Sequence, residues 1–538
     1  MMNDQLNIGA LLERAEKYFS KKQVVSRTLS GIHRFTYAEI GERTRRLMSA
    51  LKDLGVEQGD RVGTLAWNHH RHLEIYFAAP GMGAVLHTIN LRLSLEHIIY
   101  IINHAEDKVL FVDEDLLPIV EKIATKLPTV KAFIIMTDQE QLPTTNLQPV
   151  YSYEPLLEKG NPNEPFIKDI DENAPAGMCY TSATTGNPKG VVYSHRGIVL
   201  HSFALGLADT TAISESDITM AVVPMFHANA WGLPFAATWL GSTQVLPGPM
   251  FTPKLLAELI EQEKITITAG VPTIWLGLLK ELEGGNYDTS SLRAILCGGA
   301  AAPKGMINTF ETKYNIPFIH AYGMTETSPL ATLSRLKSYQ NKLSVEERLD
   351  QRAKQGILVP GLEMKVVGGN GEVAWDGVEM GELLLRGPWI ADEYYRDERS
   401  QESFKDGWLY TGDVCTVDEE GVIKLVDRTK DLIKSGGEWI SSVDLENALM
   451  AHEGVFEASV VAVPHPDWQE RPVACVVLKD PYKDKVTKED LLKFIAPQFA
   501  KWWLPDDVIF MDEIPKTSVG KFLKRALREK LQNYFVQN

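Results

Sequence analysis

Short β-rich runs alternate with helical patterns through the first half of this chain. Five such elements are expected, as strands near 61–67, 109–112 and 132–136 and helices near 72–79 and 118–127. The capping-box pair Thr36 and Glu39 predicts a further helix that runs to about Gly55. Because parallel strands need crossover connections, usually helices, this alternation predicts α/β structure with largely parallel sheets.

The 538 residues are too many for a single hydrophobic core, so at least two domains are expected. The last hundred residues have a different pattern, typical of a small α+β unit that ends in a basic helix from about Lys521. The short, charged segment 427–432 precedes this unit. We therefore predict an N-terminal domain over 1–426, a hinge or linker over 427–432 and a C-terminal domain over 433–538.

The formal net charge of −16 argues against general binding to nucleic acid or to anionic membranes, but not against small anionic ligands. We find neither a signal-peptide pattern nor a continuous apolar span, so no integral membrane segment is expected. The cysteines are isolated, which argues against a disulfide framework or a zinc site and favours a reducing cytoplasm. They are Cys179, Cys297, Cys415 and Cys475.

The most distinctive local segment is the hydroxyl- and glycine-rich run from Tyr180 to Gly190, which lies between two apolar runs. Its hydroxyls, its backbone N–H groups and the cation of Lys189 suit the binding of phosphate oxygens. The groups concerned are Thr181, Ser182, Thr184, Thr185, Gly186 and Lys189. The run is no Walker A loop, because it lacks Gly-x-x-x-x-Gly-Lys-Ser/Thr. A polar surface turn is the alternative.

Two further segments combine aromatic and acidic side chains. In the run 321–329, Tyr322 can stack on a base and Glu326 can hold Mg²⁺, which binds through few carboxylates together with phosphate oxygens. The alternative is an ordinary helix N-terminus. Residues 410–413 are expected in a turn, where Asp413 can accept hydrogen bonds from ribose hydroxyls. The alternative there is a simple Asx turn.

Of the last two segments, one crosses into the proposed C-terminal domain and the other lies within it. The run 427–441 has a charged start and the pair Gly436-Gly437, which allows close backbone approach or positive φ. A hairpin turn is the alternative. The run 515–521 ends in Lys521, which is either a functional cation or a solvated lysine at the start of a basic helix.

Together, in this order and spacing, the five segments closely resemble the adenylate-forming superfamily of acyl-CoA synthetases, luciferases and peptide-synthetase adenylation domains. The resemblance covers nearly the whole chain. Within this superfamily, the chain resembles the branch of bacterial medium- and long-chain fatty-acid–CoA ligases. The residues that carry this narrower match are 223–232, His195-Arg196 and 433–441.

The resemblance implies a large N-terminal domain of stacked sheets and a small mobile C-terminal domain, with Asp427 as the hinge. It implies that the 181–189 loop holds the β- and γ-phosphates of ATP, and that Thr184 and Glu326 bind Mg²⁺. The residues implied around the nucleoside are Gly298, Gly299, Ala300 and Tyr322 at the adenine, and Asp413 and Arg428 at the ribose. Gly323 and Thr325 are also implied to bind the cofactor.

The same resemblance implies three catalytic residues: Lys521 between the attacking carboxylate and the α-phosphate, Glu326, and His227 beside the acyl group. Trp231 is similar to the aromatic gate of the acyl tunnel in long-chain members. The face implied to approach coenzyme A after the small domain rotates consists of Lys434, Ser435, Gly436, Gly437 and Trp439. The chain departs from the family at Ala183, where Gly is usual.

The expected activity is therefore ATP-dependent formation of an acyl-adenylate and pyrophosphate, followed by transfer of the acyl group to coenzyme A with release of AMP. A coenzyme A ligase for an aromatic, branched or thioether acid remains an alternative, as do another acyl acceptor and a non-catalytic nucleotide-binding regulator. A peripheral membrane protein that uses its basic C-terminal helix is a further alternative. The chain length of the acid is left open. Long-chain members are often homodimers, so the oligomeric state is also left open.

Overall fold

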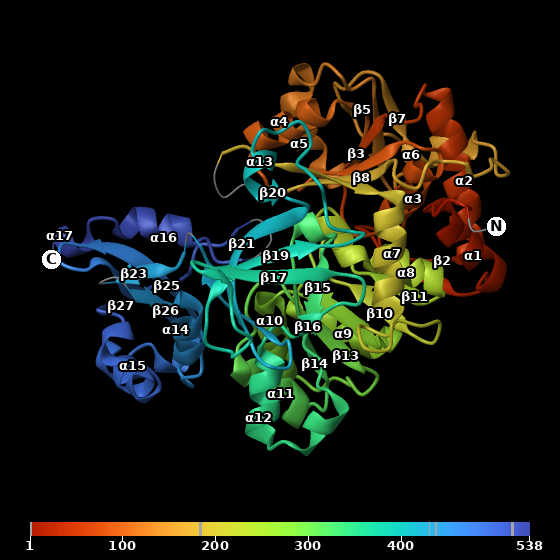
Figure 1. The fold of residues 1–538 in the computed structure, drawn as a ribbon. Coiled ribbons are helices and arrows are strands. Elements are labelled where there is room, and N and C mark those ends of the chain that lie inside the picture. The colour runs from red at the N-terminus through yellow and green to blue at the C-terminus, as the bar shows by residue number, and fades with distance from the viewer. Residues whose placement is uncertain (1–2, 182–185, 430, 436–437, 518–520, 538) are drawn as a thin grey trace.

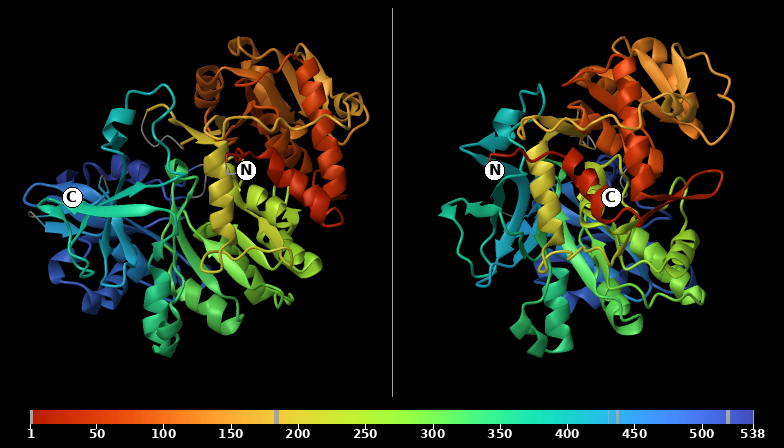
Figure 2. Two further views of the ribbon diagram at one scale, coloured as in Figure 1. Left: turned by 45° about the vertical axis from the view of Figure 1, so that its right-hand side comes forward. Right: turned by 90° about the vertical axis from the view of Figure 1, so that its right-hand side faces the viewer.

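The computed structural model describes residues 3–181, 186–429, 431–435, 438–517 and 521–537. Its main body contains two large sheets and one smaller sheet, and a C-terminal unit with its own sheet lies at one end of the molecule (Figures 1 and 2). The mixed α/β architecture expected from the sequence is confirmed.

The first large sheet has seven strands and is parallel except at its last pair, β8–β9. In spatial order its strands are β7 (Val150–Ser152), β6 (Ala132–Met136), β5 (Asp107–Asp113), β3 (Arg61–Leu65), β4 (Val85–Thr88), β8 (Pro175–Tyr180) and β9 (Gly190–Ser194). All three strands expected in this region are present.

The second large sheet has nine strands, with parallel pairing from β14 through to β1 and antiparallel pairing at both edges. Its strands are β16 (Ile357–Leu358), β15 (Leu330–Leu333), β14 (Phe318–Gly323), β13 (Ala294–Cys297), β12 (Ile267–Gly270), β10 (Ile218–Ala221), β11 (Thr243–Leu246), β1 (Gln23–Arg27) and β2 (Ile32–Thr36).

Helices connect these strands and cover the sheets. They are α1 (Gly9–Tyr18), α2 (Tyr37–Asp53), α3 (His70–Gly81), α4 (Leu95–Ala105), α5 (Leu117–Ile123), α6 (Tyr153–Glu158), α7 (His195–Gly206), α8 (Leu233–Leu240), α9 (Pro253–Glu263), α10 (Pro272–Gly284), α11 (Lys304–Lys313) and α12 (Val345–Ala353). The capping box that starts α2 is confirmed: Thr36 accepts from the backbone N–H of Glu39, and the Glu39 carboxylate accepts from that of Thr36.

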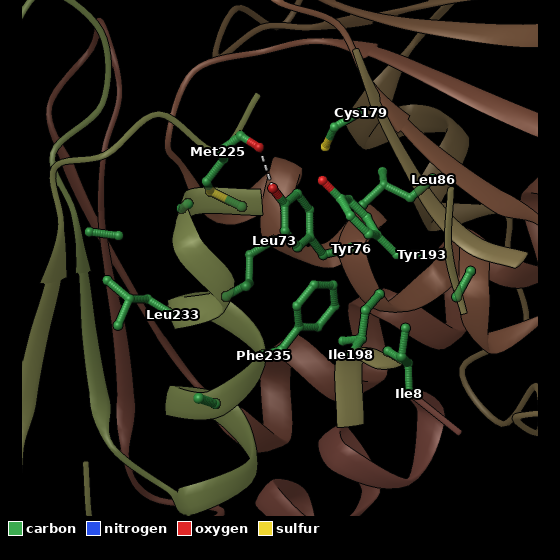
Figure 3. Close-up of a cluster of buried hydrophobic side chains, with 14 of the residues drawn as sticks. Ile8, Leu73, Tyr76, Leu86, Cys179, Tyr193, Ile198, Met225, Leu233 and Phe235 are labelled. Carbon is green, nitrogen blue, oxygen red and sulfur yellow. Dashed lines mark hydrogen bonds between the residues drawn. The ribbon is translucent and has the colours of Figure 1, made fainter. Parts of the chain in front are cut away.

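The largest core fills the space where the two large sheets face each other through α3, α7 and α8. Every residue of α3 is buried. Figure 3 shows Tyr76 of α3 beside Tyr193 of β9 and near Phe235 of α8, and the Tyr76 hydroxyl donates to the carbonyl oxygen of Met225. This packing fixes β9, and with it the end of the 181–189 loop, against the second sheet.

A third, antiparallel sheet lies beside the second. It contains β17 (Glu363–Gly368), β18 (Gly371–Glu372), β19 (Gly381–Arg386), β20 (Phe404–Lys405), β21 (Trp408–Val417) and β22 (Ile423–Arg428), with the short helix α13 (Ser400–Ser403) before β20. The prediction of a turn at 410–413 is wrong. The chain turns at Asp406 and Gly407, both at positive φ, and residues 410–413 lie within β21.

The C-terminal unit contains β23 (Ile433–Ser435), β24 (Glu438–Ile440), β25 (Val455–His465), β26 (Gln469–Leu478) and β27 (Asp507–Phe510), with the helices α14 (Ser442–Met450), α15 (Lys488–Ile495), α16 (Lys524–Leu531) and α17 (Tyr534–Gln537). Its two apolar clusters draw only on residues from Ile433 onward. Leu527 and Leu531 of α16 are buried in one of them, so this basic helix packs on its own unit. Across the described residues, no helix combines the length and the apolar character needed to cross a membrane.

Separate cores predict separate local stabilities. Leu527→Ala removes a fully buried side chain from the C-terminal unit and should cost about 2–5 kcal/mol of its stability. Hydrogen–deuterium exchange should accelerate in β25, β26 and α16 while β12 to β14 keep their protection. Phe310→Ala, in the core behind the second sheet, is the matched control and should show the reverse pattern. Equal acceleration of both units by either variant would contradict separate units.

Candidate active site

A cavity of about 460 Å³ opens where the second sheet, the third sheet, the 181–189 loop and the C-terminal unit meet. The end of β14 and the loops after β13 and β10 supply its walls, and the segment before α13 covers part of it. The predicted site residues that line it are Thr181, Lys189, His227, Trp231, Gly298, Gly299, Tyr322, Gly323, Thr325, Glu326, Arg428 and Lys521. Segments that are far apart in the sequence thus converge on one space.

The phosphate-binding loop is predicted between β8 and β9, and its two ends are held together by hydrogen bonds. The N–H of Thr181 donates to the carbonyl oxygen of Lys189 at 2.9 Å, and the N–H of Lys189 donates to the Thr181 hydroxyl at 3.1 Å. Gly186 has a φ of 70°, which glycine adopts without strain. Ser182, Ala183, Thr184 and Thr185 lie outside the described residues. A strand follows the loop, as expected for a loop that is not Walker A.

Arg399, which no sequence pattern indicated, also contacts this loop. Both terminal nitrogens of its guanidinium group donate to the carbonyl oxygen of Asn187, at 3.1 Å each. The same guanidinium is paired with Asp397, whose carboxylate holds it in place. Arg399 also lines the cavity, so it brings positive charge to the phosphate end of the site.

Glu326 is placed to hold a cation. It lies in a short 3₁₀ turn (Thr325–Thr327) after β14, and its Oε1 accepts a hydrogen bond from the Tyr394 hydroxyl at 2.6 Å. None of the described residues donates to its Oε2. The described residues contain no group of three or more His, Cys, Asp or Glu that could hold a metal. A single free carboxylate oxygen beside a phosphate loop fits Mg²⁺, which completes its shell with phosphate oxygens and water.

Asp413 contacts two other residues that are predicted to surround the nucleoside. Its Oδ2 accepts from the Tyr322 hydroxyl at 2.6 Å, and its Oδ1 lies 3.0 Å from Nε of Arg428 across the β21–β22 pair. The Asp413 charge raises the pKa of Arg428, and burial raises the pKa of Tyr322. The prediction that these three residues share one site is thus consistent with their contacts, although Asp413 itself is not among the residues that line the cavity.

Glycines give the adenine side its shape. A Cβ atom on Gly323 would lie 1.8 Å from the carbonyl oxygen of Pro329, so only glycine fits there. A Cβ atom on Gly298 would lie 3.1 Å from the Trp231 ring, and Gly299 has a φ of 83°. Ala300 does not line the cavity.

Lys521 reaches the cavity from the C-terminal unit. A Cβ atom on Gly299 would lie 3.3 Å from its Cε, which places the side chain against the 298–299 turn. No described residue accepts a hydrogen bond from its ammonium group. Burial, reinforced by the positive charge of Arg428, lowers the pKa of Lys521 to about 8, against the opposing influence of Asp413 and Glu326. An unpaired ammonium in this position is available to an anionic ligand.

The end of the cavity that is predicted to hold the acyl group is apolar. His227 and Trp231 line it together with Leu205, Val223, Leu233, Leu296 and Leu330. Burial, together with the charge of Lys521, lowers the pKa of His227 to about 3, so its imidazole is neutral at physiological pH. An apolar wall with few polar groups suits a hydrocarbon chain.

Trp231 belongs to an unusual left-handed turn. Five successive residues, 228–232, have φ values of 42°, 52°, 48°, 59° and 76°. The turn is held by the Ala230 N–H, which donates to the carbonyl oxygen of His227, and by a 3.4 Å contact between the Asn229 side chain and the Cys179 thiol. A Cβ atom on Gly232 would lie 2.6 Å from the His201 ring, so the turn ends at a position that only glycine can occupy.

Of the residues predicted to face coenzyme A, the three that the structure describes, Lys434, Ser435 and Trp439, do not line the cavity. Lys434, Ser435 and Trp439 lie in the β23–β24 hairpin, where the Lys434 ammonium is 4.7 Å from the Trp439 ring centroid. Gly436 and Gly437 lie outside the described residues. Asp427 is buried at the end of β22, and its carboxylate accepts from the backbone N–H groups of Arg428 and Ser442.

Comparison with known proteins is consistent with this geometry. The family model described as AMP-binding enzyme matches residues 11–395, and that described as AMP-binding enzyme C-terminal domain matches residues 444–521. The long-chain-fatty-acid–CoA ligase of Thermus thermophilus is 52% identical over 99% of this chain and 97% of its own length. The 3-methylmercaptopropionyl-CoA ligase of Ruegeria lacuscaerulensis is 44% identical over 99% of this chain and 98% of its own length.

Among solved structures, the anthranilate CoA ligase AuaEII in complex with anthranoyl-AMP matches with a TM-score of 0.87 and 25% identity, covering 98% of each chain. Both family models fit their parts of the chain, and the sequence relatives extend over nearly its whole length. This chain belongs to the family of AMP-binding enzymes.

Proposed function

We propose that this protein is an ATP- and Mg²⁺-dependent fatty-acid–CoA ligase that forms acyl-AMP and pyrophosphate, and then acyl-CoA and AMP. The observation that carries the proposal is a single cavity with cationic groups at one end and an apolar wall at the other. An acyl-adenylate has the same two halves. The similarity to a long-chain-fatty-acid–CoA ligase along nearly the whole chain supports this assignment.

The obstacle to the first step is repulsion between a carboxylate and an anionic triphosphate, so positioned cations should supply much of the catalysis. We assign this role to the Lys521 ammonium, which we place between the carboxylate and the α-phosphate. Lys189 and the loop hydroxyls would hold the β- and γ-phosphates. Glu326, together with Thr184, would hold Mg²⁺, whose chemistry when bound is to neutralise charge on the phosphates.

The remaining residues would orient the substrates. Asp413 and Arg428 would hold the ribose, and the Tyr322 ring would lie against adenine. The imidazole of His227, neutral because burial and the nearby Lys521 lower its pKa, would position the carboxylate without adding charge. Trp231 would separate the acyl pocket from the nucleotide.

For the second step we propose that the C-terminal unit, 433–538, rotates about Asp427 in the 427–432 linker. Lys521 would then withdraw and the 434–439 hairpin would approach coenzyme A. The separation of the apolar cores on either side of the linker supports two rigid units. Such gating motions are common in enzymes that must expose one site to two reactions.

We also propose that the protein is cytoplasmic and forms a homodimer. All four cysteines are buried and free, which fits a reducing cytoplasm. A homodimer is proposed from the resemblance to long-chain members, and sedimentation-velocity analysis of the purified protein tests it.

The substrate class can be measured by AMP release from ATP and Mg²⁺ with carboxylic acids from acetate to long-chain fatty acids, including a thioether acid and an aromatic acid. We expect turnover that requires coenzyme A and is greatest with medium- or long-chain acids, because the acyl wall is apolar. Greatest turnover with the thioether acid would instead favour an activity like that of the 3-methylmercaptopropionyl-CoA ligase. AMP release that does not need coenzyme A would overturn the assignment of the acceptor.

Lys521→Ala should separate the two half-reactions. Removing the ammonium should slow acyl-AMP formation by roughly 10²–10³-fold, the effect of removing one positioned donor in comparable sites. The rate of acyl-CoA formation from supplied acyl-AMP should stay within about threefold of wild type. Single-turnover assays measure both rates, and an equal loss in both would contradict the role assigned to Lys521.

The same lysine should set the alkaline pH limit of adenylation. Its ammonium is lost as pH rises through the lowered pKa of about 8, so kcat/KM for ATP should be level below that pH and fall above it. His227, with a pKa near 3, should contribute no change between pH 5 and pH 8. In Lys521→Arg, which stays charged, the alkaline fall should disappear. An unchanged fall in that variant would assign it to another group.

A further inference from the structure

Tyr394 occupies a special position in the segment that covers the phosphate end of the cavity. Its backbone pairs with Val191 of β9, and the N–H of the next residue, Tyr395, donates to the carbonyl oxygen of Gly190 at 2.8 Å. In the same segment, Ala391 donates its N–H to the carbonyl oxygen of Glu326 at 2.8 Å. The segment is therefore tied to both the phosphate loop and the Glu326 turn.

The Tyr394 side chain contacts the two opposite charges that the reaction needs. Its hydroxyl donates to Oε1 of Glu326 at 2.6 Å, and the Lys189 ammonium lies 3.8 Å from its ring centroid. The first contact is a charge-assisted hydrogen bond and the second a cation–π interaction. Within the described part of the chain, Lys189 and Glu326 form no ion pair with each other.

Without this ring, the lysine and the carboxylate would be free to pair directly. Such a pair in a partly buried site is costly to break, and each partner would neutralise the other. Lys189 would then be less available to phosphates, and Glu326 less available to a cation. A tyrosine contacts both groups without neutralising either charge, because its ring face attracts the ammonium and its hydroxyl orients the carboxylate.

We propose that Tyr394 is a positioning residue that keeps Lys189 and Glu326 apart, so that the lysine remains available to the phosphates of ATP and the carboxylate to Mg²⁺. This role rests on the proposed function. The ordinary alternative is that Tyr394, which is 3% exposed and packs edge-to-face on Phe404, only fills space. The two ideas predict different results for a set of matched variants.

ATP binding, measured by calorimetry without any carboxylic acid, gives a readout that does not depend on turnover. Tyr394→Phe keeps the ring under Lys189 but loses the hydroxyl, so ATP binding in EDTA should stay near wild type. The Mg²⁺ concentration that half-maximally tightens ATP binding should rise roughly tenfold to a hundredfold, the usual effect of losing a group that orients a metal ligand. Tyr395→Phe, which removes the neighbouring hydroxyl, is the control and should match wild type in both measurements.

Tyr394→Leu removes both contacts, so Lys189 can pair with Glu326 and ATP binding in EDTA should weaken by roughly tenfold or more. Adding Glu326→Gln should restore this binding, because the lysine then has no carboxylate to pair with. In the wild-type background Glu326→Gln should improve it much less. The difference between the two backgrounds is the coupling that the proposal requires.

Equal effects of Glu326→Gln in both backgrounds would overturn the proposal, as would an unchanged Mg²⁺ response in Tyr394→Phe. Tyr394→Phe keeps the packing on Phe404. Its Mg²⁺ dependence of ATP binding therefore tests the positioning role even if Tyr394→Leu fails to fold. Failure of the proposed function itself is seen separately, as absence of ATP binding by the wild-type protein.

Discussion

The carboxylate of Asp413 joins the parts of the chain that build the cavity. It accepts from Tyr322 of the second sheet and is paired with Arg428, the last residue of β22 in the third sheet. Its negative charge also favours the protonated form of Lys521, which belongs to the C-terminal unit, and so opposes the lowering of the pKa of that lysine. Without Asp413, Arg428 and Lys521 would repel each other in a site of reduced dielectric. One buried anion therefore allows two cations to share the position where negative substrates must meet.

Contiguous motifs were predictable from the sequence, and contacts between distant segments were not. The 181–189 loop, the 321–329 turn and Lys521 each stand in a short recognisable run, and the structure brings all three to one cavity. Tyr394 and Arg399 stand in no such run. Their partners Glu326 and Asn187 lie 68 and 212 positions away, so only the folded chain shows the contacts.

The error at 410–413 has a physical cause. Threonine, glycine and aspartate in succession are typical of a turn, and Gly412 does have a φ of 71°. Pairing with β19 and β22 on both sides nevertheless keeps these residues in β21. Tertiary pairing outweighed local preference there, whereas the capping box of α2, which needs only neighbouring residues, formed as predicted. The turn at 228–232 is a similar case, since four non-glycine residues in left-handed conformation cost about 1–2 kcal/mol each and no local pattern predicts them.

Lys521 reaches the cavity from a unit joined to the main body by only a few residues. Such a tether makes the arrival of the ammonium an intramolecular event, with an effective concentration on the order of millimolar for a short flexible connection. Under the proposed rotation, the cation would be present in the cavity only for the fraction of time that the C-terminal unit is docked. Contacts between α16 and the 427–432 segment, such as the pair between Arg528 and Asp431, would help to set that fraction. Substitutions at such contacts would then change turnover by changing how long the two units stay together, without altering a residue that is proposed to touch ATP or the acid.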